Sequence, residues 1–379
     1  MIAGRLRPFG TTIFTEMSAL AARTGALNLG QGFPDTDGPA EIIDAVTSAM
    51  LAGANQYAPL AGVPALRMAI AEHQRRRYGL EIDPDDGVQV TFGATEAIAA
   101  TMLGLLEPGD EVVVLEPFYD SYAATIAIAG AERRLVTLRP PDFAVDLDAL
   151  AGAARGARML LLNSPHNPTG RVLTRAELEA IARVCVEHDL IAVTDEVYEH
   201  LVFDGEHIPL ATLPGMAQRT LTISSAGKSF SFTGWKVGWC SGPPQLIAGV
   251  RSAKQFLSFA GGTPFQHAIA AALTDAERHV EPLRASLRAG RDLLCEGLSG
   301  AGFAVTVPQG GYFVQADAVA LGVGDAAAWC RELPARAGVV AIATSAFYDD
   351  AHAGRTLVRF AFCKRAAVIE EAVARLAAV

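Results

Sequence analysis

Short apolar runs alternate with helical patterns through the middle of this chain, and this alternation restricts the fold more than any other feature. Runs such as 111–115 and 159–163 have strand length, and the helical patterns at 120–129 and 174–187 follow them. Such alternation is typical of a mostly parallel sheet covered by helices. We therefore predict an α/β domain, with further strands at residues 133–138, 190–195, 220–225 and 235–241 and a further helix at 245–259.

The clearest helix start is Thr174, which has Glu177 three residues later, the spacing of a capping box. From about residue 268 the pattern changes to a long helix, short strands and a C-terminal helix, which indicates a smaller α+β domain. The strands expected there are 302–307, 311–315 and 357–362. We predict three parts: an N-terminal arm joined to the small domain (1–40), a large domain (41–267) and a small C-terminal domain (268–379).

Composition excludes several classes of partner. The formal net charge of −10 argues against nucleic acid or an anionic membrane as the main partner. The N-terminus lacks an apolar core of signal-peptide length, and no apolar run is long enough to span a membrane. Five cysteines without CxxC spacing predict buried thiols, with neither a disulfide framework nor a metal site. We expect a cytoplasmic protein.

Lys228 lies in a run of small and aromatic residues, Ser224–Gly238, directly after a β-branched stretch. Small neighbours allow a planar ligand to approach the backbone. A second cation, Lys236, follows eight positions later, and a lysine held near other cations has a lowered pKa and becomes an amine nucleophile. The alternative is a surface lysine in a Ser/Gly loop.

Polar residues follow three of the predicted strands. Asn167 follows 159–163, Asp195 and Tyr198 follow 190–195, and Lys228 follows 220–225. Ligands of parallel sheets bind outside the carboxyl ends of the strands, so we expect these side chains to converge. Asp195 could instead cap a helix or form a buried salt bridge, and Asn167 could simply form an Asn-Pro turn.

An anion site is predicted where Gly93–Thr95 follows the strand 88–92 and opens an apolar helix. The free N–H groups and dipole of a helix start attract anions. With Ser225 and Lys236 arriving from other strands, this region would form a phosphate cup. An ordinary helix start is the alternative.

As a set, these motifs resemble those of the class I and II aminotransferases, which are fold-type I enzymes dependent on pyridoxal 5′-phosphate (PLP). The resemblance extends from about residue 28 to 359. It implies a fold-type I PLP transferase, with a large α/β domain and a smaller α+β domain. The motifs that carry it are Gly30–Asp35, Asn163–Gly170, Asp195–Tyr198 and Ser225–Lys228.

The resemblance also implies roles for these residues. Lys228 would carry PLP as a Schiff base and move the substrate proton. Asp195 would pair with the pyridine nitrogen, while Tyr198 and Asn167 would contact the cofactor oxygen O3′. The residues that match family contacts to the phosphate are Ala94, Thr95, Ser225 and Lys236.

Two details of this match leave alternatives. Many relatives carry arginine where Lys236 stands, and lysine keeps the charge but loses the bidentate fork. Tyr119 matches the aromatic residue that covers the PLP ring, although Phe118 could take that place. Core packing is the alternative for Phe118 and Tyr122.

Arg359 lies among apolar residues of a predicted strand, so it needs exposure or an anionic partner. The resemblance assigns Arg359 to the substrate α-carboxylate, together with the backbone N–H of Gly32 and with Asn167. It assigns Tyr57 to the phosphate of a neighbouring subunit. A homodimer with shared active sites would follow.

The implied activity moves an amino group from an amino acid to a 2-oxo acid such as 2-oxoglutarate, in a ping-pong reaction through aldimine and ketimine forms. Within the family, the chain resembles kynurenine, glutamine and methionine aminotransferases, and it looks most like actinobacterial N-succinyldiaminopimelate aminotransferases of lysine biosynthesis. Small residues at 261–263 would leave room for a long polar substrate. The arginines that could bind its distal carboxylate have no predicted place: Arg5, Arg7 and Arg23.

Other functions use similar parts. Cysteine-S-conjugate β-lyases, decarboxylases and cyclopropane-forming synthases share the PLP scaffold. A PLP-binding transcription regulator would need a DNA-binding segment, for which we expect no room before Asn28. An NAD-dependent Rossmann enzyme would need a Gly-x-Gly-x-x-Gly fingerprint after its first strand, and this sequence has none there.

Overall fold

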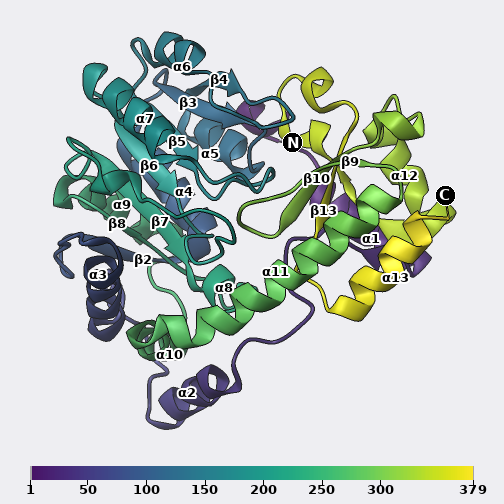
Figure 1. Cartoon of the computed structure of the whole chain (residues 1–379). Coiled ribbons are helices and arrows are strands. Elements are labelled where there is room, and N and C mark those ends of the chain that lie inside the picture. Colours follow the sequence, from purple (N-terminus) through teal and green to yellow (C-terminus); the bar gives the residue numbers. More distant parts are fainter. Residues whose placement is uncertain (1, 379) are drawn as a thin grey trace.

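The computed structural model describes residues 2–378, in a large α/β unit beside a smaller α+β unit (Figure 1). Residues 1 and 379, the ends of the predicted terminal parts, lie outside the described residues. A seven-stranded sheet forms the centre of the large unit. Its strand order is β2 (Val88–Phe92), β8 (Val237–Ser241), β7 (Thr220–Ser225), β6 (Ile191–Asp195), β5 (Met159–Asn163), β3 (Glu111–Glu116) and β4 (Glu132–Thr137).

The five strands from β7 to β4 are parallel, and only β8 runs against both of its neighbours, β2 and β7. The predicted fold class, α/β with a mostly parallel sheet, is therefore confirmed. The register aligns the ends of three strands, because Asn163 lies beside Asp195 and Asp195 lies beside Ile223. Side chains that follow these residues leave the sheet at one edge.

Helices cover both faces of this sheet, and this explains why its central strands, such as β3 and β5, are mostly apolar and buried. In β3, Val112 and Val114 face the core beneath α4 (Gly93–Leu105), α5 (Ser121–Ala129) and α9 (Pro244–Leu257). Val113 and Leu115 face the opposite core, which is covered by α6 (Leu147–Ala154) and α7 (Arg175–Glu187). The predicted capping box is present at the start of α7, where Thr174 and Glu177 bond each other reciprocally.

Three more helices pack together beyond β2: α2 (Ala40–Leu51), α3 (Pro64–Tyr78) and α10 (Thr263–Thr274). The long helix predicted from residue 268 is in fact α10 followed by α11 (Ala276–Gly300), and Asp275 separates the two. The predicted domain boundary at 268 therefore falls inside α10. Because α10 packs on α2 and α3, its contacts join it to the large unit.

The small unit contains an antiparallel sheet of order β12 (Ile342–Ala343), β13 (Leu357–Ala361), β10 (Phe313–Asp317) and β9 (Ala304–Thr306). An N-terminal strand, β1 (Leu27–Asn28), pairs with β11 (Val339–Val340), and so the N-terminal residues contribute to this unit. Its helices are α1 (Ile13–Thr24), α11, α12 (Ala326–Ala337) and α13 (Ala366–Leu376).

The short helices are α8 (Ala226–Ser229) and the 3-10 turns at Gly4–Leu6, Leu210–Thr212, Thr233–Trp235, Val319–Leu321, Thr344–Phe347 and Ala351–Gly354. The strand predicted from Trp235 begins only at Val237, because Trp235 ends a 3-10 turn and Lys236 has a φ of 55°. Within residues 2–378, no helix is both long and apolar enough to cross a membrane.

Candidate active site

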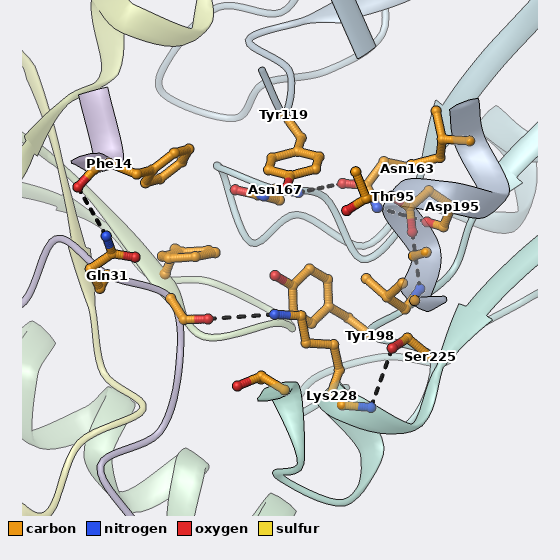
Figure 2. A pocket seen from close by; sticks show the side chains of 18 of the residues that line it. Phe14, Gln31, Thr95, Tyr119, Asn163, Asn167, Asp195, Tyr198, Ser225 and Lys228 are labelled. Carbon is orange, nitrogen blue, oxygen red and sulfur yellow. Dashed lines mark hydrogen bonds between the residues drawn. The ribbon is translucent and has the colours of Figure 1, made fainter. Parts of the chain in front are cut away.

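A cavity of about 360 Å³ lies between the two units, at the carboxyl ends of β5, β6 and β7 (Figure 2). Its wall contains all but one of the residues predicted for the site, although they are dispersed from position 32 to position 359. These residues are Gly32, Ala94, Thr95, Tyr119, Asn167, Asp195, Tyr198, Ser225, Lys228, Lys236 and Arg359.

Lys228 enters the cavity from α8, directly after β7. Its Nζ atom donates to Tyr312 Oη at 2.6 Å and lies 3.5 Å from the carbonyl oxygen of Gly32. Burial lowers the pKa of Lys228 to about 8, so a substantial fraction of this amine is neutral near pH 8. From the sequence, neighbouring cations were expected to lower this pKa. Burial is the larger cause, and Lys236 and Arg359 add to it.

Asp195 is the last residue of β6, and its side chain is almost fully buried. Its Oδ2 atom accepts a hydrogen bond of 2.7 Å from Tyr122 Oη, and Oδ1 accepts one of 3.3 Å from Val197 N. Burial raises the pKa of Asp195 to about 6, although both hydrogen bonds oppose the shift. The salt bridge considered for Asp195 is absent among residues 2–378. The carboxylate is therefore suited to a cationic ligand atom.

Asn167 belongs to a chain of amide hydrogen bonds that joins three strands. Asn163 Nδ2 donates to the carbonyl oxygen of Asp195 at 2.7 Å, and Asn163 Oδ1 accepts from Asn167 N at 2.6 Å. Asn167 Oδ1 then accepts from Arg359 Nη1 at 3.1 Å. Asn167 thus lies in an Asn-Pro turn and also faces the cavity, so the two alternatives considered for it are compatible.

Arg359 extends from β13 and is fully buried. Its guanidinium carbon lies 3.9 Å from the ring centre of Phe313, 4.6 Å from that of Phe347 and 5.2 Å from that of Phe14. Nη2 donates to the carbonyl oxygen of Gly30 at 2.8 Å, but Nε has no hydrogen-bond partner in the part of the chain that the structure describes. Burial lowers the pKa of Arg359 to about 10, and the group stays cationic at neutral pH. A buried cation with unused donors is an anion site.

A second anion site surrounds the start of α4. The N-cap residue Phe92 has no side chain that could cap this helix, and among residues 2–378 Glu96 Oε2 bonds only the N–H of Phe92 itself, so the N–H groups of the first turn are available for a ligand. Gly93 has a φ of 76°, and a Cβ atom at this position would lie 3.2 Å from Lys236 Nζ. Gly238 allows equally close packing, because its Cβ would lie 2.7 Å from Ala94 N. Because Gly93 and Gly238 have no side chain, β8 and the Lys236 ammonium can pack closely against the helix start.

The three aromatic residues after β3 have different positions. Tyr119 lines the cavity, whereas Phe118 is buried in the core beneath α4 and α5. The ring-covering role of Tyr119 stays a prediction, and Phe118 takes the core position that was considered as its alternative. Core packing was the alternative considered for Tyr122, which is buried, but its hydroxyl also bonds Asp195.

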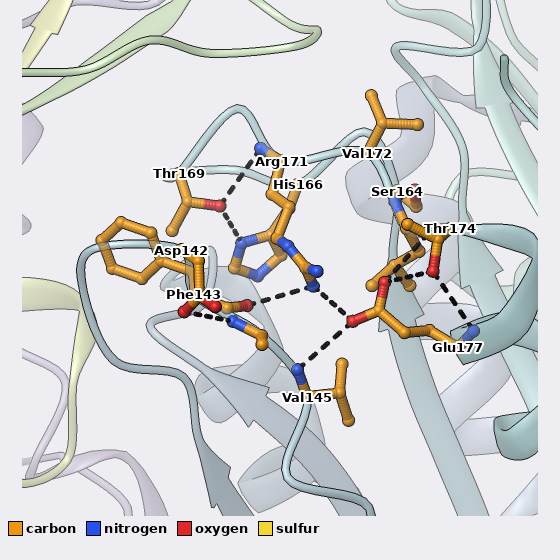
Figure 3. Close-up of polar contacts among 12 residues, drawn as sticks. Asp142, Phe143, Val145, Ser164, His166, Thr169, Arg171, Val172, Thr174 and Glu177 are labelled. Carbon is orange, nitrogen blue, oxygen red and sulfur yellow. Dashed lines mark hydrogen bonds and ion pairs between the residues drawn. The ribbon is translucent and has the colours of Figure 1, made fainter. Parts of the chain in front are cut away.

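A polar network supports the loop that carries Asn167 (Figure 3). Arg171 Nη1 bonds Glu177 Oε1 at 2.7 Å and the carbonyl oxygen of Phe143 at 3.2 Å. His166 Nδ1 lies 2.8 Å from Thr169 Oγ1, and burial lowers the pKa of His166 to about 3, so this ring is neutral. The network ties the loop to the start of α7.

Tyr57 is the exception among the predicted site residues. Its side chain is 85% exposed, contacts the Phe259 ring edge-on at 5.6 Å and lies outside the cavity wall of its own chain. The residues at 261–263 also lie outside this wall. Thr263 Oγ1 donates to the carbonyl oxygen of Gln56 at 2.6 Å, and this bond joins the two segments.

Sequence reasoning missed several residues of the site. Tyr312 bonds Lys228, Tyr122 bonds Asp195, and Asn163 links Asp195 to Asn167. Asn163 ends a predicted strand, and its position could have indicated a role. The other cavity residues that were missed are Phe14, Gln31, Ile98, Val197, Gly227, Thr233 and Phe313.

This fold and this cavity are those of a fold-type I PLP transferase. The model of the family "Aminotransferase class I and II" matches residues 24–376, and the chain therefore belongs to that family and is an aminotransferase. Aminotransferases of this family use pyridoxal 5′-phosphate.

Individual relatives agree. A probable N-succinyldiaminopimelate aminotransferase of Mycobacterium tuberculosis is 54% identical over 99% of this chain and 98% of its own length. The solved structure of the Mycobacterium tuberculosis N-succinyldiaminopimelate aminotransferase superposes with a TM-score of 0.98 over the whole of both chains. The methionine aminotransferase of Escherichia coli is 39% identical over 98% of this chain and 97% of its own.

Proposed function

We propose that the cavity is the active site of an aminotransferase whose amino donor is N-succinyldiaminopimelate and whose acceptor is a 2-oxo acid such as 2-oxoglutarate. One observation supports the site above all others: a fully buried arginine with unused donors, Arg359, shares a cavity with a buried lysine of lowered pKa, Lys228. The relative of 54% identity supports the donor.

The residues of the cavity fit PLP. The free N–H groups of Ala94 and Thr95, with Ser225 and Lys236, would hold its phosphate. The ionised Asp195 would face the ring nitrogen, and Tyr119 would cover the ring. When bound, PLP supplies a carbonyl group for the amine and a ring that withdraws electrons from the substrate Cα.

The protein's own residues would then control the substrate. Arg359 and Asn167, with the backbone of Gly32, would orient the α-carboxylate. Lys228 Nζ would take the proton from the substrate Cα and return it to the cofactor carbon C4′. An amine with a pKa near 8 exchanges protons readily at neutral pH. Tyr198 and Asn167 would hold the cofactor oxygen beside the lysine.

A donor panel tests the substrate. We expect N-succinyldiaminopimelate to have a higher kcat/KM than methionine, kynurenine or glutamine, with 2-oxoglutarate as acceptor. A clear preference for methionine or kynurenine would replace this donor with that of another relative. Release of ammonia and pyruvate from a cysteine S-conjugate, without transamination, would identify a β-lyase instead. The three arginines considered for the distal carboxylate, Arg5, Arg7 and Arg23, lie outside the cavity wall.

We also propose a homodimer in which Tyr57 completes the phosphate site of the partner subunit. Exposed apolar side chains support an interface near Tyr57: Phe259 contacts it, and Leu51 and Phe256 are 85% and 84% exposed. The five free, buried cysteines agree with a reducing compartment, which we propose to be the cytoplasm.

Mixing two inactive variants tests the shared site. Tyr57→Ala supplies an intact Lys228, and Lys228→Ala supplies an intact Tyr57. After the subunits exchange, half of the dimers are mixed and one site in each is complete, so activity should recover to roughly one quarter of the wild-type value. If mixing restores nothing, or if light scattering shows a monomer, Tyr57 does not act across an interface.

A further inference from the structure

A buried polar network lies beside the active site but outside the cavity wall, around Glu199. Ser224 Oγ donates to Glu199 Oε1 at 2.5 Å, and Tyr78 Oη donates to Oε2 at 2.7 Å. His73 Nε2 lies 3.5 Å from Oε2. Next along the chain, His200 Nδ1 lies 2.8 Å from Ser229 Oγ. Of these six side chains, all but that of Tyr78 are buried.

The partners of this network have a particular place in the sequence. Glu199 and His200 follow Asp195 closely, while Ser224 and Ser229 lie on either side of Lys228. The backbone ladder between β6 and β7 ends with the bond of 2.8 Å from Glu196 N to the carbonyl oxygen of Ile223. Beyond that point, the two side-chain pairs continue the connection between the two segments.

The charge of Glu199 makes this connection sensitive to substitution. Burial opposes ionisation, but the contact with His73 and the hydrogen bond from the Ser224 hydroxyl hold the pKa of Glu199 well below its ordinary value. Burial lowers the pKa of His200 to about 3, so its ring is neutral. A buried carboxylate that loses one of these partners is left with an uncompensated charge, and the surrounding segments must shift.

The same groups could also face a metal ion. One ligand atom each from His73, Glu199 and His200 lies within 4.8 Å of the others. Both oxygens of Glu199, however, already accept hydrogen bonds from hydroxyl groups. The contacts therefore favour a hydrogen-bonded connection, and metal retention becomes a result that would contradict it.

We infer that Glu199 and His200 are positioning residues. Their hydrogen bonds fix the segment that carries Asp195 relative to the segment that carries Lys228, and they contact neither substrate nor cofactor. The inference rests on the proposed function for its catalytic meaning. Its direct consequence, the environment of the Lys228 amine, can be measured without cofactor or substrate.

The experiment measures the pH profile of Lys228 modification in the full-length, cofactor-free protein. Reductive methylation is followed by peptide mass spectrometry, and each profile is normalised to its plateau at high pH. The wild-type midpoint is expected near the pKa of about 8. In His200→Leu, water gains access to the Lys228 amine, and the midpoint of its modification profile should rise by about one pH unit. This lowers the neutral fraction of Lys228 at pH 8 about fivefold. Glu199→Gln and Ser229→Ala should shift it in the same direction.

Two variants separate positioning from a general loss of stability. His200→Asn keeps a polar atom near the place of Nδ1 and should restore the wild-type midpoint. Thr101→Ala removes a buried hydroxyl that bonds Ala97 within α4, and it should lower Tm without moving the midpoint. In the aminotransferase assay, His200→Leu should lower kcat and leave KM for the amino donor unchanged, because Arg359 lies outside the network.

Two results would overturn the inference. One is a fall in Tm for His200→Leu and Ser229→Ala with an unchanged midpoint. The other is one equivalent of zinc retained by the purified wild-type protein and lost in Glu199→Gln. Failure of the aminotransferase assay with every donor would contradict the proposed function and leave the labelling result intact.

Discussion

The bond between Tyr122 and Asp195 leads to a prediction that depends on pH. Asp195 has a pKa of about 6 in the folded protein, raised by burial from its ordinary 3.8. The folded state therefore holds this proton more tightly than the unfolded chain does. Protonation of Asp195 therefore adds roughly 3 kcal/mol to the free energy of unfolding. This contribution is fully present below about pH 4 and is lost as the pH rises through 6.

Tyr122→Phe removes the hydrogen bond of 2.7 Å that opposes this loss. A hydrogen bond to a charged group contributes about 1.5–3 kcal/mol and one between neutral groups about 1 kcal/mol, so the charged form loses about 1.4 kcal/mol more. The pKa of Asp195 should therefore rise by about one unit. The substitution should cost about 1.4 kcal/mol more at pH 8, where Asp195 is ionised, than at pH 5, where it is protonated.

Urea unfolding of the cofactor-free protein at the two pH values measures this difference, with fluorescence from the buried Trp239 in the large unit. Tyr348→Phe is the matched control. It removes a buried hydroxyl that bonds the neutral carbonyl of Leu138 at 2.9 Å, so its cost should be the same at both pH values. Equal costs at pH 5 and pH 8 for Tyr122→Phe would refute the assigned role of the bond.

Three further substitutions follow from the geometry. Gly93→Ala places a Cβ atom 3.2 Å from Lys236 Nζ at a φ of 76°. It should lower the stability of the folded protein by about 1 kcal/mol and weaken PLP binding in a fluorescence titration. Gly152→Ala is the control, because the space around Gly152 is open and PLP should bind normally. Arg359→Lys loses the fork that bonds Asn167 and Gly30, and KM for the amino donor should rise at least about tenfold; an unchanged KM would exclude Arg359 from carboxylate binding. Thr174→Ala removes the cap of α7 and should cost about 1 kcal/mol in thermal unfolding, with kcat unchanged; no loss of stability would contradict the capping box.

The fold and the candidate site could be predicted from the sequence where a short local pattern determines the position of a residue. Buried parallel strands are visible as apolar runs, and the polar residues at their carboxyl ends that line the cavity, such as Asp195 and Lys228, could be predicted from the strands themselves. The capping box at Thr174 is equally local. Its two partners are only three residues apart, so the pattern is visible without a fold.

The remainder depends on contacts between distant segments. Tyr312 reaches Lys228 across 84 positions and Tyr122 reaches Asp195 across 73, so no spacing rule indicates either pair. The lowered pKa of Lys228 was predicted, but its main cause was not, because burial is a property of the assembled cavity. The single helix predicted from residue 268 was wrong because the break at Asp275 carries neither Gly nor Pro.

The central claim is that Lys228 is the residue to which the cofactor attaches. Borohydride reduction of the PLP-loaded protein, followed by peptide mass mapping, tests it directly. The account predicts one phosphopyridoxyl group per chain, on Lys228, and none after the same treatment of Lys228→Ala. Attachment to another lysine, or no covalent cofactor in the wild-type protein, would contradict it.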